Sequence, residues 1–150
     1  MRILGIDYGT KRIGLAISDE NHILAFPKET ILNNRDIFKN FGNILKKENI
    51  REVVVGESLD FKGESNTVAE KINVFISQLE KKFKVKTHRQ KEFLTSVEAR
   101  KDGKTKVNFQ KIQAHSKMKD KKRGRVDASA AALILQRYLD LRLRQEGQNQ

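Results

Sequence analysis

Three acidic residues, Asp7, Glu92 and Asp127, stand where carboxylates from distant parts of the chain could meet. Asp7 closes an apolar run just before Gly9, a pattern typical of a strand entering a turn. Converging carboxylates repel one another unless cations neutralise them, and hard divalent ions such as Mg²⁺ or Mn²⁺ prefer oxygen ligands. Two such ions about 4 Å apart can activate water and stabilise the leaving oxygen in phosphodiester cleavage. The three acids therefore suggest a metal-dependent nuclease.

Asp127 is the most informative of the three acids. It falls early in a predicted helix over 126–143, on the apolar face, as its neighbours at helical spacing show: Ala130, Ala131, Ile134, Leu135 and Tyr138. A small-residue cluster over 130–132 would let this helix approach the sheet closely. The helix dipole alone could favour an Asp in a first turn, but it does not explain the face.

Each of the other acids also has a simpler interpretation. Asp7 could bond its own turn backbone, and Glu92 taken alone could be a solvated loop residue. Glu57, which follows another predicted strand, is a reserve candidate for the metal site.

Hydrophobic periodicity predicts the elements that must position these residues. Strands are expected around 3–6, 13–17, 23–31, 53–56 and 83–88, and helices over 37–45 and 68–79, from Thr95, and over 126–143. The first three strands are joined so tightly that they should be antiparallel, with Pro27 indicating an edge or an irregularity in the third. The strands at 1–7, 52–56 and 84–90 are linked by helices, so they should be parallel. Their carboxyl ends then share one rim, where sites in open α/β sheets form.

The chain has 150 residues and a net charge of +12, concentrated in one segment. Residues 100–125 contain eleven basic and two acidic residues, a net charge of +9. This concentration points to a nucleic-acid partner. The residues expected to contact phosphates are Lys11, Arg12, Lys117, Lys119, Lys121, Lys122, Arg123 and Arg125.

Composition excludes several other classes of protein. The absence of cysteine rules out disulfides and thiolate metal sites. No apolar run approaches the ~20 residues of a membrane span, so we expect no membrane partner and a cytoplasmic protein. The length favours one domain over 1–145, with a basic, mobile segment at about 102–124 and a polar tail at 146–150.

Three motifs resemble those of the bacterial YqgF family. The stretch Ile6-Asp7-Tyr8-Gly9-Thr10-Lys11-Arg12-Ile13-Gly14 resembles its opening motif, Glu92-Phe93-Leu94-Thr95-Ser96-Val97-Glu98-Ala99 its second, and Val126-Asp127-Ala128 with the helix that follows its third. The matches occur in the family's order and span nearly the whole chain, the second being the weakest. The chain departs from the family pattern at two places. It has Lys91-Glu92-Phe93 where the family usually has Asp-Glu-Arg, and Gly56-Glu57-Ser58 where the family has Gly-Leu-Pro. These changes bear on substrate contacts more than on the fold.

The resemblance implies a fold, a site and a substrate. The fold is an α/β, ribonuclease H-like mixed five-stranded sheet, three strands antiparallel and the rest parallel, with helices on both faces. Asp7, Glu92 and Asp127 form the catalytic, metal-binding triad, and the substrate is the 5′ end of pre-16S rRNA in ribosome biogenesis. The protein is expected to act as a monomer or weak homodimer.

Three other functions are compatible with the residues. The same chemistry could serve a Holliday junction resolvase acting on DNA, or the protein could bind RNA without cleaving it. Asp7-Tyr8-Gly9-Thr10 also resembles the phosphate loop of sugar-kinase and actin-like ATPases, but 150 residues cannot supply the two lobes of those proteins.

Overall fold

The computed structural model describes residues 1–57, 65–91 and 122–148. The elements in these residues, in chain order, are β1 (Arg2–Asp7), β2 (Arg12–Ser18), β3 (Ala25–Leu32), α1 (Ile37–Lys47), β4 (Ile50–Glu57), α2 (Ser65–Phe83), β5 (Lys86–Lys91) and α5 (Lys122–Gln148). None of the helices in these three stretches is both long and apolar enough to cross a membrane.

The five strands form one mixed sheet in the order β3-β2-β1-β4-β5. The β1–β2 and β2–β3 pairs are antiparallel, whereas β1–β4 and β4–β5 are parallel. Both the predicted strand directions and the edge position of the third strand are confirmed. The register between β2 and β3 shifts next to Pro27, which cannot donate a ladder hydrogen bond.

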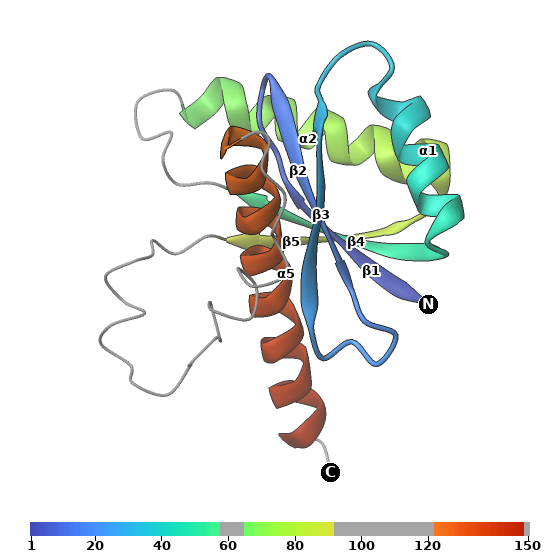
Figure 1. Cartoon of the computed structure of the whole chain (residues 1–150), viewed down its shortest axis with the longest axis vertical. Helices are drawn as coiled ribbons and strands as arrows, with labels where there is room; N and C mark the ends of the chain where they lie inside the picture. Colours follow the sequence, from blue (N-terminus) through green and yellow to red (C-terminus); the bar gives the residue numbers. More distant parts are fainter. Residues whose placement is uncertain (58–64, 92–121, 149–150) are drawn as a thin grey trace.

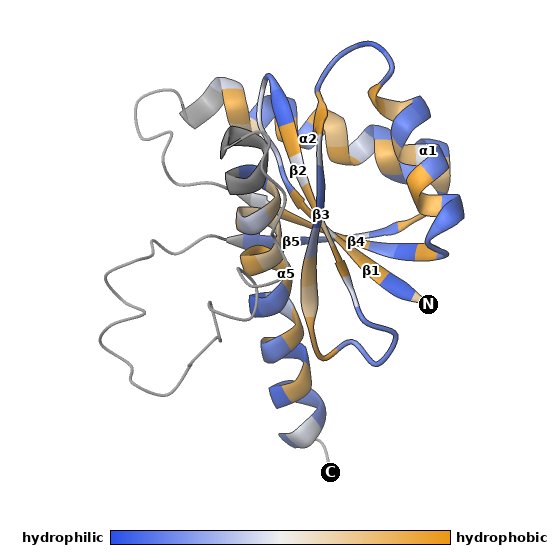
Figure 2. Cartoon of the chain, viewed as in Figure 1, coloured by the Kyte–Doolittle hydropathy of each residue, from blue (hydrophilic) through white to orange (hydrophobic). Residues whose placement is uncertain are grey.

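Helices cover both faces of the sheet, and each face has its own core (Figure 1). Alternate residues of a strand point to opposite faces, so Leu4 and Ile6 pack toward α1 and α2, while Ile3 packs toward α5. The α1/α2 side is the larger core and includes Phe41 and Leu79, both completely buried. Apolar residues line the sheet, and the last turns of α5 are mostly hydrophilic (Figure 2).

Helix α5 is longer than the predicted 126–143. It begins at Lys122 and ends at Gln148, so 122–124 and 146–148 are helical, where a mobile segment and a polar tail were expected. Apart from Gly124 and Gly147, the residues added are Lys, Arg, Glu and Gln, which are good helix formers, and a 3.1 Å ion pair joins Arg142 to Glu146 one turn later. Apolar periodicity could not detect these turns because they are polar all round.

The third strand starts later than predicted, at Ala25 rather than Ile23. The Asp19 carboxylate accepts hydrogen bonds from the backbone N–H groups of Ile23 and Leu24 at 2.7 and 2.9 Å, which holds these residues in the turn. The helix expected from Thr95 and the basic segment up to residue 121 lie outside the described residues.

Candidate active site

Asp7 is the last residue of the central strand β1, and the residue beside it on each neighbouring strand is a glycine. Gly14 of β2 and Gly56 of β4 are its register partners, and Gln90 of β5 continues the same row. Residues in one row share a face, and Asp7 lies on the face that α5 covers, two alternations after Ile3. The three parallel strands therefore end along one rim, as predicted, with Asp7 at its centre.

Asp127 is brought to the same row by direct backbone contact between α5 and β2. A Cβ atom placed on Gly14 would lie 2.0 Å from the carbonyl oxygen of Asp127. No side chain fits in that space, so the backbones of the helix and the strand can come into direct contact here only because the strand residue is glycine. Because Gly14 pairs with Asp7, this contact places the backbone of Asp127 beside the row that holds Asp7.

Two more strand glycines extend the close packing of α5 along the sheet. A Cβ on Gly5 would lie 2.7 Å from the Cβ of Leu135, and one on Gly56 would lie 2.2 Å from Ile134 Cδ1. The expected close approach of this helix is confirmed. The small helical residues that suggested it supply only one side of the contact, because the sheet contributes glycines from three strands, all on one face. Glycine inside a strand is the signal that could have revealed this.

Arg12, expected to contact phosphate, is paired with Asp127. Its Nε atom lies 3.4 Å from Asp127 Oδ2. The pair is separated by 115 residues in the chain, and nothing in the spacing predicts it. Lys11 is exposed in the neighbouring turn, where its carbonyl accepts a hydrogen bond from the backbone N–H of Asn33 at 3.0 Å.

The carboxylate of Asp127 is suited to a cation. Its Oδ2 atom is buried and, among the described residues, accepts no hydrogen bond. Carboxylate oxygens are the ligands that Mg²⁺ and Mn²⁺ prefer. The third expected ligand, Glu92, lies outside the described residues, as does the side chain of the reserve candidate Glu57. Accordingly, the part of the chain that is described contains no group of three or more acidic or histidine side chains that could hold a metal.

The other predicted phosphate contacts fall on or before the start of α5. Lys122, Arg123 and Arg125 belong to the first turns of the helix, directly before Asp127. Lys117, Lys119 and Lys121 lie outside the described residues. The backbone of α5 thus places three of the basic residues within two turns of Asp127.

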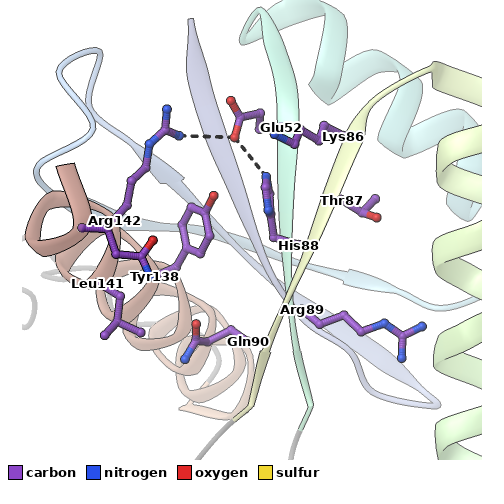
Figure 3. A pocket seen from close by; sticks show the side chains of 10 residues that line it. Glu52, Lys86, Thr87, His88, Arg89, Gln90, Tyr138, Leu141 and Arg142 are labelled. Atoms are coloured by element: carbon purple, nitrogen blue, oxygen red, sulfur yellow. Dashed lines mark hydrogen bonds and ion pairs between the residues drawn. The ribbon is translucent and has the colours of Figure 1, made fainter. Parts of the chain in front are cut away.

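A groove of about 640 Å³ lies on the α5 face of the sheet, between β5 and the C-terminal half of α5 (Figure 3). At its centre Glu52 Oε2 is 3.1 Å from His88 Nε2 and 3.3 Å from Arg142 Nη1. The rings of His88 and Tyr138 are 5.0 Å apart. Burial, with the Glu52 charge adding to it, raises the pKa of the Tyr138 hydroxyl. These contacts attach the end of α5 to the sheet, and none of the predicted site residues lines the groove.

Comparison with known proteins identifies relatives along nearly the whole chain. The RuvX family model, described as Holliday junction resolvase, matches residues 1–141. A protein of Koribacter versatilis named "Putative pre-16S rRNA nuclease" is 39% identical over 144 residues, covering 94% of this chain and 88% of its own. A protein of the same name from Chlorobaculum tepidum is 33% identical over 139 residues, covering 93% of each chain.

Solved structures share the fold at lower sequence identity. Thermus thermophilus RuvC in complex with a Holliday junction substrate aligns with a TM-score of 0.61 and 18% identity, covering 95% of this chain and 96% of that one. The fowlpox virus resolvase bound to Holliday junction DNA aligns with a TM-score of 0.52 and 18% identity, covering 95% and 99%. The ribonuclease H-like fold is thereby confirmed. The chain belongs to the RuvX (YqgF) family of nucleases, which are phosphodiester hydrolases.

Proposed function

We propose that this protein is a divalent-metal-dependent endonuclease that processes the 5′ end of pre-16S rRNA in the cytoplasm. The observation that carries the proposal is the contact of α5 with Gly14, which sets Asp127 beside the row of Asp7. The relatives' names supply the substrate.

In this proposal Asp7, Glu92 and Asp127 hold the metal. The buried Oδ2 of Asp127, which accepts no hydrogen bond from the described residues, supports its part in that site. When bound, Mg²⁺ or Mn²⁺ supplies a water of lowered pKa and stabilises the leaving oxygen of the phosphodiester. The chain's own contribution is to fix the carboxylates on rigid elements, a strand end and a helix packed against it.

The basic residues bind and orient the nucleic acid. Lys11 and Arg12 lie at the rim, and Lys122, Arg123 and Arg125 lie in the turns that precede Asp127. Phosphate contacts of this kind release counterions, so affinity for RNA should fall steeply as salt rises.

The test is cleavage of a 5′-labelled pre-16S rRNA fragment in Mg²⁺, in Mn²⁺ and in EDTA. We expect cleavage only with metal, and a loss of at least about 10²-fold in Asp7→Asn and in Asp127→Asn, since each removes one charged ligand. Asp36→Asn makes the same chemical change at an exposed position beside α1 and should cleave normally. Cleavage in EDTA, or wild-type rates in both site variants, would refute the proposal.

A second candidate is a Holliday junction resolvase, favoured by the description of the family model. The same preparation should be offered a four-way DNA junction under the same conditions. Symmetric cutting of the junction without cleavage of the RNA would establish this alternative. RNA binding without cleavage of either substrate would instead indicate a non-catalytic RNA-binding protein.

A further inference from the structure

The contact between Arg12 and Asp127 combines opposite charges without a hydrogen bond. The Nε–Oδ2 distance is 3.4 Å, yet the buried Oδ2 atom has no hydrogen-bond partner among the described residues. A buried carboxylate oxygen normally accepts hydrogen bonds, because leaving it unsatisfied costs free energy. The guanidinium therefore neutralises the charge of Asp127 without donating a hydrogen bond to its Oδ2 atom.

The Arg12 side chain has room to leave this position. It is 40% exposed, whereas that of Asp127 is 27% exposed. Arg12 begins β2 and, by strand alternation, shares the α5 face with Gly14, so it stands one alternation nearer the rim than the Asp7 row. A partly exposed arginine at this place, with one ion pair to the described residues, can turn toward solvent at small cost.

We infer that Arg12 is an exchangeable counter-ion, which neutralises Asp127 until a divalent cation takes the carboxylate and then becomes free for a phosphate. The inference rests on the proposed function, because it concerns the same metal site. Guanidinium and cation compete for one carboxylate, so each weakens the binding of the other. A phosphate that engages Arg12 removes the competitor, and by linkage nucleic acid and metal then strengthen each other's binding through this one residue.

The experiment measures Mn²⁺ affinity of the full chain without nucleic acid, from the free-ion electron paramagnetic resonance signal. We expect Arg12→Gln to bind Mn²⁺ about thirtyfold more tightly than the wild type at low salt, since one positive charge about 4 Å from a divalent ion is worth roughly that factor even in water. Lys11→Gln removes the same charge from the exposed neighbouring turn, further from Asp127, and should raise the affinity by a clearly smaller factor because the Coulomb energy falls with distance. Asp127→Asn should weaken binding in either background.

A second variant and a folding control complete the design. Arg12→Lys keeps the charge on a flexible ammonium and should fall between Arg12→Gln and the wild type. Far-ultraviolet circular dichroism should be unchanged in all variants, because the exchanged side chain is partly exposed.

The two ways of failing are distinct. If the wild type binds Mn²⁺ and Arg12→Gln binds it no more tightly, the counter-ion role is overturned while the proposed function stands. If Lys11→Gln gains as much as Arg12→Gln, the effect is general electrostatics and the specific role is also overturned. If neither the wild type nor any variant binds Mn²⁺, the metal site itself is refuted, and with it the proposed function.

Discussion

Substituting alanine for Gly14 should move Asp127 away from Asp7 without replacing either acid. The new Cβ would lie 2.0 Å from the carbonyl oxygen and 2.3 Å from the carbonyl carbon of Asp127. These are backbone atoms that no rotamer change can move aside. The start of α5 must therefore retreat by about 1 Å, a displacement of the size that lowers catalytic rates about 10²-fold. The overpacking itself should cost about 1–3 kcal/mol of stability.

The assay is single-turnover cleavage of labelled pre-16S rRNA at saturating Mg²⁺, paired with thermal unfolding of the same samples. Gly5→Ala is the matched control, because its Cβ would press on Leu135 and on the carbonyl of Ala131, one to two turns further along α5. It should lose comparable stability and keep most of the activity. Gly147→Ala meets nothing within 4 Å and should leave activity unchanged.

Two results would refute this reasoning. A folded Gly14→Ala protein that cleaves at the wild-type rate would mean that the position of Asp127 does not depend on this contact. Equal losses of activity in Gly14→Ala and Gly5→Ala would mean that general destabilisation, rather than the geometry of the acids, limits cleavage.

Three further predictions concern stability and can be measured by urea unfolding. The hydrogen bond from Lys28 to Glu48, at 2.6 Å, lowers the pKa of that carboxyl below its ordinary 4.5. Glu48→Gln should therefore cost about 1–2 kcal/mol of stability above pH 5. The difference in stability from the wild type should vanish as the pH falls through the lowered pKa. Gln136 is buried, accepts from the Ala25 N–H at 2.9 Å and donates to the Ile23 carbonyl at 2.8 Å, so Gln136→Leu should cost about 1–3 kcal/mol at any pH; an unchanged midpoint would contradict this. Leu135 of α5 is completely buried against the sheet, and Leu135→Ala should cost about 2–5 kcal/mol.

Much of the fold was predictable because it depends on local periodicity. Alternating and helical apolar patterns identified the strands and helices of the described residues, and short connections dictated which strands run antiparallel. The misplaced boundaries have physical reasons. The polar ends of α5 carry no apolar stripe, and Asp19 ties Ile23 and Leu24 into a turn through hydrogen bonds that hydropathy does not record.

The sequence by itself determined the sheet, the rim at which its parallel strands end, and the presence of Asp7 and Asp127 as candidate acids. Only the tertiary structure decided how these acids are held. Gly14, Gly5 and Gly56 come from three strands, and their common role exists only once those strands lie side by side beneath α5. The pairing of Arg12 with Asp127 likewise joins residues far apart in the chain. A glycine inside a strand signals a close approach, but charge and steric contact act through space, so spacing along the sequence does not identify the partner.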